Sequence, residues 1–436
     1  MDDKHLRSTD NQPETSNSNG EQIKPNDSHG VDDQINEIKP LSQPGSNDLP
    51  EIIDPDDFVS SFGERLEEVL SIDTWRSGED LALIFERLDF EINQAIEKEN
   101  EISREVRKVL VPRIASRPNA PKGAGLYRAT IEQLEAVQRN VLFNGGVEAC
   151  DGKRMVHDTL PITIAQIGIC LVSYNGEQGS WMHHLYRRDL RLQGVDPLEE
   201  ALATLEQRDS RSGVDQPSKR DRLSELAQRG IMSYAERAVL LDKSIKPWRM
   251  GHGNLAPYEL LTGSGSMDLL LASLEVLNRL ILEHRQFVFI PSAPAERLLL
   301  TIGNALRPLE FAIIDTSEER MQRIVEQGHL RGRYRDAALS FYKEAAPKVV
   351  VGVYRTFEEV APQIFYAHAD FAQEAAMIAM ADSVLQTNRG FPMLIDIANS
   401  VCSSTFGADG FNSIIQAAYA KQGCSLRYLG ERETRP

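Results

Sequence analysis

The sequence predicts an α/β protein built on a mixed sheet that is flanked by helices. Strand-like apolar runs occur at residues 147–150, 162–174, 181–192, 287–290, 310–314 and 349–354. The first three follow one another closely, as antiparallel strands do, whereas the later ones are separated by helical segments. Hairpins pair their strands antiparallel, whereas strand–helix–strand units place their strands parallel. Their combination in one chain therefore favours a sheet with both kinds of pairing.

Residues 1–50 form a polar N-terminal tail that we expect to be disordered. The tail is rich in Asp, Asn, Ser, Pro and Gln, and it cannot bury enough apolar surface to offset the entropy of ordering. It contains ten acidic and four basic residues, so it carries −6 of the net charge of −17 and leaves −11 for the rest. An acidic body disfavours non-specific coating of nucleic acid but permits a local basic channel.

Residues 51–140 are predicted to be helical, with helices at about 58–70, 78–114 and 127–141. The longest has apolar residues in a 4-3-4-3 spacing with Glu99 as the one polar intruder: Leu81, Phe85, Leu88, Ile92, Ala95, Ile102, Val106 and Val109. A long, narrow apolar seam is typical of a coiled-coil contact. It indicates either a homodimer interface or packing of the helix on its own domain. Residues 141–436 would then form the main domain, ending in helices at about 369–386, 392–403 and 410–421.

Cysteine usage and hydropathy favour a cytoplasmic protein. The four cysteines, Cys150, Cys170, Cys402 and Cys424, form no pair with metal-ligand spacing. Two of them lie in apolar strand-like runs, which predicts buried thiols in a reducing compartment. The N-terminal residues do not have the pattern of a secretory signal, and no apolar run reaches the roughly 18 residues that span a bilayer. We therefore expect no membrane association.

Nucleotide-binding and protease motifs are absent from the sequence. There is no Walker A motif, no GxGxxG and no HExxH. Residues Gly263-Ser264-Gly265 open a helix, so they form either an anion site or a plain Gly-rich loop with Ser266 as the N-cap. No Ser-His-Asp order stands out either.

Carboxylates near the ends of predicted elements are the better indication of chemistry. Asp151 ends a strand before Gly152, Glu259 lies in a loop rich in Gly, Pro and His that covers residues 247–265, and Asp315 ends the run at 310–314. Asp396 follows a Gly-Phe-Pro turn. Each acid alone fits a turn, a cap or a surface charge. Together they fit a divalent cation site, because hard cations need several converging oxygen ligands.

Two short motifs carry a resemblance to a known family. The first is the strand that ends in Asp151-Gly152, and the second is Gly390-Phe391-Pro392-Met393-Leu394-Ile395-Asp396. Their order and separation resemble the NurA nuclease family, from about residue 147 to the C-terminus. The resemblance implies an RNase H/PIWI-like core, Mn²⁺- or Mg²⁺-dependent DNA cleavage, and a HerA-like hexameric ATPase as partner. It also implies a role in DNA end processing, in repair or phage defence.

The same resemblance implies a set of site residues. Asp151 and Asp396 take the positions of the family's end acids, although Lys153 stands where the family has Ser. The family's helical Glu is Glu236 or Glu259, and we prefer Glu259 because its loop also contains His252. The second Asp-Gly-Ser of the family is expected after a middle strand, but the strand at 287–290 ends in Pro291-Ser292. Asp315 would replace that acid, or the acid is lost.

These residues define the predicted site and its alternatives. Asp151, Glu259 and Asp396 would hold the metal with Asp315 as a fourth ligand, and His252 or His368 would assist proton transfer. The predicted DNA contacts are basic: Arg187, Arg188, Arg191, Arg331, Arg333, Arg335 and Arg389. A solvated charged face is the alternative for all of them except Arg389. Two further hypotheses are an adaptor subunit with a degraded site and a metal-dependent nuclease or phosphatase of another RNase H-like group.

Overall fold

The computed structural model describes residues 55–75, 81–159, 162–176, 178–187, 219–294, 296–328 and 330–425. The predicted disordered tail, residues 1–50, lies outside these ranges. The chain divides into two compact units, one up to Glu86 and one from Arg87 onward. Among the described helices, none is long and apolar enough to cross a membrane.

The first unit contains two short helices where one was predicted. Helix α1 spans Pro55–Phe62 and α2 spans Leu66–Leu70, followed by a 3-10 turn at Ile72–Thr74. Gly63 separates them with a φ of +73°, a left-handed conformation that glycine adopts without strain. The indole of Trp75 then donates a hydrogen bond of 2.8 Å to the carbonyl of Val69 and closes the turn after α2.

The long predicted helix is present as α3, Leu81–Glu105, which continues through a π-turn at Val106–Leu110 and a 3-10 turn at Val111–Arg113. Its seam stays largely exposed to solvent: Phe85 is 63%, Leu88 50% and Ile92 47% exposed. The far end packs on the second unit, where Arg107 binds both carboxylate oxygens of Glu310 at 2.7 and 2.9 Å. The C-terminal end of the helix therefore packs on its own domain.

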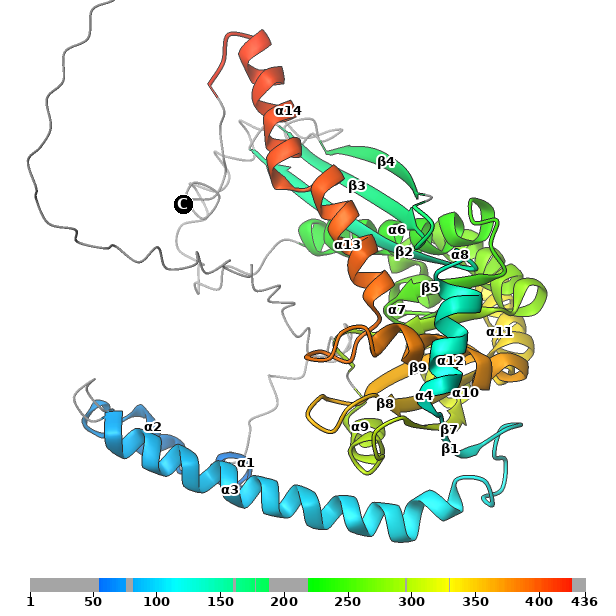
Figure 1. The fold of residues 1–436 in the computed structure, drawn as a ribbon. Coiled ribbons are helices and arrows are strands. Elements are labelled where there is room, and N and C mark those ends of the chain that lie inside the picture. Colours follow the sequence, from blue (N-terminus) through cyan, green and yellow to red (C-terminus); the bar gives the residue numbers. More distant parts are fainter. Residues whose placement is uncertain are drawn as a thin grey trace, which may run out of the picture. The chain divides into compact units, whose positions relative to one another are not determined.

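The second unit is built on a mixed sheet, which confirms the predicted fold class (Figure 1). Its described strands have the order β1-β7-β8-β9-β6-β5-β2-β3-β4. They span Gly125–Arg128 (β1), Val147–Asp158 (β2), Thr163–Val172 (β3), Gln178–Arg187 (β4), Trp248–His252 (β5), Phe287–Ile290 (β6), Glu310–Thr316 (β7), Val349–Arg355 (β8) and Gln363–His368 (β9). The pairs β2–β5 and β5–β6 are parallel, and the other pairs are antiparallel.

Strands β1, β5 and β9 were not predicted from the sequence. Strand β5 falls in the segment that was predicted to be a loop, yet it lies between β2 and β6 in the sheet. It is five residues long, and it carries the polar side chains of Arg249 and His252. Arg249 is nevertheless 7% exposed, because its guanidinium donates to backbone carbonyls near the end of α6, including that of Ser244 at 3.2 Å. Buried backbone acceptors thus allow a polar residue in an interior strand.

Helices cover both faces of the sheet, and each face has its own apolar core. One core joins the sheet to α6 and α8, and the other joins it to α4, α12 and α13 (Figure 1). The helices span Ile131–Val137 (α4), Lys219–Asp242 (α6), Tyr258–Thr262 (α7), Met267–Asn278 (α8), Arg297–Asn304 (α9), Glu318–Gln327 (α10), Gly332–Ala345 (α11), Ala372–Ser383 (α12), Met393–Phe406 (α13) and Ala408–Lys421 (α14). The segment 125–140, which precedes the expected domain boundary at 141, belongs to this unit.

Candidate active site

The carboxyl ends of β5 and β6 bring His252 and Ser292 beside Asp151 of β2. The prediction that Asp151 ends a strand was wrong, because β2 continues to Asp158 in antiparallel pairing with β3. In the parallel ladders, Cys150 lies opposite Gly251, and His252 lies opposite Ile290. Asp151 therefore follows the β2–β5 ladder at the level where β5 ends in His252, and Ser292 follows the end of β6. The carboxyl ends of parallel strands are where ligands bind in open α/β sheets. The sheet topology thus marks this end as a site.

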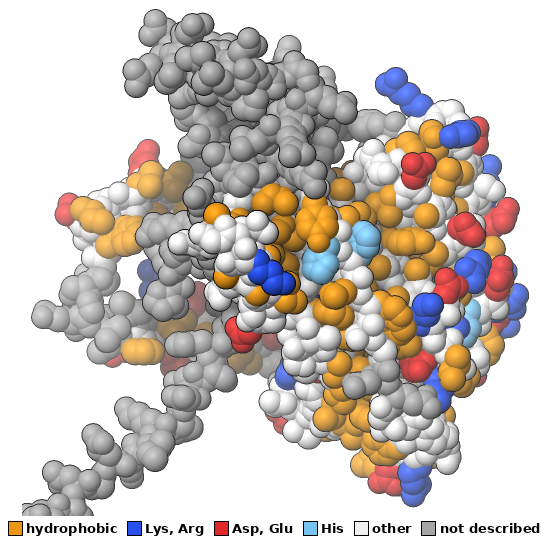
Figure 2. All heavy atoms as spheres, turned by 90° about the horizontal axis from the view of Figure 1, so that it is seen from above, with side chains coloured by type: hydrophobic (Ala, Val, Ile, Leu, Met, Phe, Trp, Pro, Cys, Tyr) orange, Lys and Arg blue, Asp and Glu red, His pale blue; other side chains and the backbone are white. Residues whose placement is uncertain are grey.

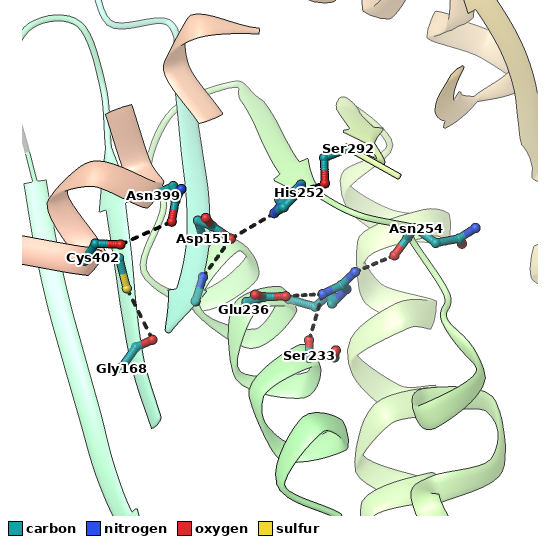
Figure 3. Close-up of polar contacts among 12 residues, drawn as sticks. Asp151, Gly168, Ser233, Glu236, His252, Asn254, Ser292, Asn399 and Cys402 are labelled. Atoms are coloured by element: carbon teal, nitrogen blue, oxygen red, sulfur yellow. Dashed lines mark hydrogen bonds and ion pairs between the residues drawn. The ribbon is translucent and has the colours of Figure 1, made fainter. Parts of the chain in front are cut away.

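A chain of hydrogen bonds connects the three side chains (Figure 3). Asp151 Oδ1 lies 3.1 Å from His252 Nδ1, and His252 Nε2 lies 2.9 Å from Ser292 Oγ. The backbone N–H of Gly152 donates to the same Asp151 oxygen at 2.9 Å. The side chain of Asp151 is 6% exposed and that of His252 is 33% exposed. Burial lowers the pKa of His252, but the hydrogen bond and charge of Asp151 outweigh this and raise the pKa above its ordinary value.

Glu236 reaches the same strand from helix α6. A Cβ on Gly152 would lie 2.7 Å from Glu236 Oε1, so the absence of a side chain at Gly152 makes room for this carboxylate. The other Glu236 oxygen accepts a hydrogen bond from Arg237 Nη1. Burial and the nearby charge of Asp151 raise the pKa of Glu236 to about 7, although Arg237 acts in the opposite direction. Glu236 can therefore hold a proton near neutral pH.

Arg237 connects α6 to the loop that follows β5. It is 2% exposed and donates to the carbonyls of Ser233 at 3.1 Å, Leu255 at 3.2 Å and Asn254. Its guanidinium carbon also lies 5.2 Å from the ring centroid of Phe289 on β6. This buried positive charge offsets the two neighbouring carboxylates, which would otherwise repel each other and any anionic substrate.

The Gly-Phe-Pro turn reaches the site through its aromatic ring rather than through Asp396. The Phe391 ring lies 6.2 Å from the His252 ring at an interplanar angle of 80°. Asp396, in the first turn of α13, accepts hydrogen bonds from Gln386 at 2.6 Å and from Arg389. The guanidinium of Arg389 lies 5.7 Å from the Phe391 ring centroid. Arg389 and His252 thus both lie near the Phe391 ring.

The structure does not bring Asp315 to Asp151, and it shows no contact between Glu259 and Asp151. Asp315 lies on β7, where it pairs with Arg117 at 2.8 Å. Four strands lie between β7 and β2 in the sheet. The two are therefore five strand spacings apart, or about 24 Å at roughly 4.8 Å per spacing. Glu259 lies in the first turn of α7. Its backbone carbonyl accepts a hydrogen bond of 3.4 Å from the Ser264 hydroxyl. His368 ends β9, where its Nδ1 accepts from the backbone of Asp370.

The predicted DNA contacts have different outcomes. Arg187 ends β4, whereas Arg188 and Arg191 lie outside the described residues. Arg331 and Arg333 lie at the start of α11, and the Arg333 guanidinium stacks over the Tyr334 ring at 4.7 Å. Figure 2 shows one face on which apolar and histidine side chains lie together, while Lys and Arg are spread among acids. This view contains no continuous basic patch among the described side chains.

The cluster contains metal-binding residue types but does not fit a metal ion as it is arranged. Within the described part of the chain, no group of three or more His, Cys, Asp or Glu side chains is placed to hold one. The reason lies in the pleat. Asp151 pairs with Cys170, which packs against α13, whereas Gly152 pairs with Ile169 in the core that contains α6. The carboxylates of Asp151 and Glu236 therefore approach from the two faces of the sheet.

Sequence reasoning missed the roles of β5, Ser292 and Arg237 in this cluster. The strand that follows the Glu236 helix is β5, and it ends in His252-Gly253-Asn254. Residues 248–252 alternate between large and small or polar side chains, but the segment is short and polar enough to resemble a loop. Ser292 was noted only because no acid occupied that strand end.

Comparison with known proteins gives only structural neighbours. No family model matches the chain, and no curated protein sequence matches it. Similar solved structures include several of NurA. NurA from Sulfolobus solfataricus aligns at 10% identity with a TM-score of 0.43, covering 78% of this chain and 97% of that chain. NurA bound to dAMP and manganese aligns at 10% identity with a TM-score of 0.38, covering 74% and 93%. At these identities and TM-scores, the likeness assigns no activity to this chain.

Proposed function

We propose that the protein is a hydrolase that cleaves phosphodiester bonds in DNA at the cluster of Asp151, His252 and Glu236. The observation that carries the proposal is the hydrogen bond of 3.1 Å between the buried Asp151 of β2 and the partly exposed His252 at the end of the neighbouring strand β5. An imidazole held in this way is suited to proton transfer with a bound substrate. The choice of DNA as substrate is supported by the two motifs that resemble the NurA family.

The chain's own residues divide the chemistry between them. Asp151 orients the His252 ring through Nδ1 and leaves Nε2 facing the exposed side of the site, where it can take or give a proton. Glu236, whose pKa is raised to about 7, is a second group that can exchange a proton near neutral pH. Arg237 lowers the electrostatic cost of bringing a phosphate to two acids.

A divalent cation does not enter these steps, because the present arrangement does not fit one. Asp151 Oδ1 already accepts from Gly152 and His252, and Glu236 is bound to Arg237. Dependence on Mn²⁺ or Mg²⁺ is thus a property that the cleavage assay has to measure. Among the described residues, no group of side chains is placed to hold a metal ion. This favours the second candidate function, a NurA-like adaptor subunit without nuclease activity.

The proposal includes partners. The exposed apolar seam of α3, with Phe85, Leu88 and Ile92 each about half exposed, is suited to a homodimer contact through a second copy of the helix. The family resemblance supports a HerA-like hexameric ATPase as the second partner and a role in DNA end processing, in repair or phage defence. Both associations are part of the proposal and are tested together with it.

The test is DNA cleavage by the purified full chain. Labelled single-stranded and double-stranded DNA would be incubated with the protein, with and without a HerA-type ATPase, in Mn²⁺, in Mg²⁺ and in EDTA. We expect the variants Asp151→Asn and His252→Gln to lose at least about 100-fold in rate. The matched control His183→Gln changes an exposed histidine on β4 and should cleave normally. Absence of cleavage by the wild-type protein in every condition would reject the nuclease and leave the adaptor.

A further inference from the structure

Ser292 occupies the third position of an ordered hydrogen-bonded relay. Its Oγ lies 2.9 Å from His252 Nε2, while His252 Nδ1 lies 3.1 Å from Asp151 Oδ1. We propose that Ser292 is a nucleophile, activated by His252 and positioned by Asp151, that attacks the phosphodiester and forms an intermediate in which Oγ is joined to the remaining DNA strand through phosphorus. The substrate class rests on the proposed function, whereas the nucleophile rests on the geometry alone.

The order of the three groups is the order that activation of a hydroxyl requires. An ionised carboxylate only accepts hydrogen bonds, so the Nδ1 nearest to Asp151 carries the imidazole proton. Nε2 is then the free acceptor of the neutral ring, and the group within reach of it is the Ser292 hydroxyl. A carboxylate at Nδ1 and a hydroxyl at Nε2 are the arrangement that hydrolases with a serine nucleophile share across unrelated folds.

Burial decreases along the relay toward the nucleophile. The Asp151 side chain is 6% exposed, that of His252 is 33% exposed, and Ser292 belongs to the exposed residues. The buried acid is thus shielded from water, while the hydroxyl is accessible to a substrate. A hydrogen bond made only to fill a gap in the core would not present its serine to solvent.

The surrounding structure holds the relay in place from several sides. Gly152 donates its N–H to the Asp151 oxygen that faces His252. The edge-on ring of Phe391 lies 6.2 Å from the imidazole and restricts its rotation. His252 ends β5 and pairs with Ile290 at the end of the parallel strand β6, and Ser292 follows two residues later, so the β5–β6 ladder positions the backbone at this end. Support of this kind keeps reacting groups close to the geometry that the reaction needs.

The proposed reaction has two balanced steps. In the first, Ser292 Oγ forms a bond to phosphorus as its proton passes to His252 Nε2. The bond from phosphorus to the leaving nucleotide oxygen breaks, and that oxygen takes the proton from His252. In the second, a water molecule gives a proton to His252 and attacks phosphorus. The bond from phosphorus to Ser292 Oγ then breaks, and Oγ recovers the proton. No oxidant, reductant or further reactant is required.

The test uses a fluorophosphonate probe, which reacts with activated serines. The serine oxygen replaces fluoride on phosphorus, and mass spectrometry of the digested full chain locates the adduct. We expect the adduct on Ser292 in the wild-type protein, no adduct there in Ser292→Ala, and labelling at least 100-fold slower in His252→Gln. Ser340→Ala, which changes an exposed serine on α11, is the matched control and should label as the wild-type protein does.

Cleavage of DNA by the same variants separates the relay from the proposed function. Loss of both labelling and cleavage in Ser292→Ala, with an unchanged thermal unfolding midpoint, supports the relay on DNA. Ser292 labelling that depends on His252, in a protein that cleaves no DNA, supports the relay and overturns the proposed substrate. Wild-type cleavage that persists in Ser292→Ala, or Ser292 labelling that is indifferent to His252→Gln, overturns the relay.

Discussion

Replacing Gly152 with alanine is the most direct probe of how Glu236 enters the site. The new Cβ would lie 2.7 Å from Glu236 Oε1 and 3.0 Å from both Ile169 Cδ1 and Met232 Cγ. Real Cβ contacts lie at about 3.4–4 Å, so the carboxylate must move by about 0.7 Å or more. The interior is close-packed, and such overpacking costs about 1–3 kcal/mol in the free energy of unfolding.

The same displacement should also reduce the rate of cleavage. A shift of about 1 Å in a group that takes part in the reaction costs about 100-fold in rate. Urea unfolding would measure the first effect, and the DNA cleavage rate would measure the second. Gly410→Ala is the control, because the nearest atom to its new Cβ is the Thr405 carbonyl oxygen at 4.0 Å. Alanine in that helix should stabilise the protein slightly, by up to about 1 kcal/mol.

A double-mutant cycle isolates the contact with Glu236. If the clash lies with its carboxylate, Gly152→Ala should destabilise a Glu236→Ala background less than the wild-type protein, by about 1 kcal/mol or more. The residual cost would come from Met232 and Ile169. A Gly152→Ala protein with wild-type stability and a wild-type cleavage rate would refute the reasoning, and so would equal costs in the two backgrounds.

Three other perturbations test the pH dependence, the seam and the attachment of the long helix. Burial raises the pKa of Asp382 to about 7 from about 3.9 in the unfolded chain, so the folded state binds more protons and its stability should fall between about pH 4 and 7. Asp382→Asn should remove this fall in urea unfolding at a series of pH values, and an unchanged slope would contradict it. Ile92→Asp should dissociate a dimer in sedimentation experiments while Glu91→Gln does not, and a wild-type protein that is monomeric at all concentrations would reject the seam as an interface. Arg107→Ala removes two of the hydrogen bonds to the buried Glu310 and leaves that from the Arg307 backbone. It should cost about 2 kcal/mol in unfolding free energy, whereas a cost below about 0.5 kcal/mol would show that the pair contributes little.

Local patterns in the sequence were sufficient to predict the elements with strong periodicity. The long helix was expected over 78–114, and α3 with its terminal turns occupies Leu81–Arg113. Strands β3, β6, β7 and β8 coincide with apolar runs, because strands buried inside a sheet consist mostly of apolar residues. Only the first four residues of β2 were predicted, since its polar second half, from Asp151 to Asp158, has no such run. Strand β5 was not predicted because Arg249 and His252 interrupt its apolar pattern. The backbone carbonyls that accept hydrogen bonds from the buried Arg249, such as that of Ser244, lie outside the strand.

The choice among acids depended on information that no short segment contains. Glu236 and Glu259 both fitted the expected helical acid, and the loop with His252 favoured Glu259, yet the structure places Glu236 over Gly152. Asp315 matched the expected pattern of a strand followed by an acid, but strand order puts β7 far from β2. Ser292 carried no signal at all until the β5–β6 register placed its hydroxyl beside His252.

The sequence by itself determined the mixed α/β class, the long helix with its seam, and Asp151 and His252 as candidate active-site residues. These properties follow from periodicity and from residue chemistry, which are local. Only the tertiary structure decided which residues share the site, because strand order and register are set by packing between distant segments. Asp151 and His252 are separated by 101 positions in the chain but by 3.1 Å in the fold, and the parallel pairing of β2 with β5 accounts for that difference.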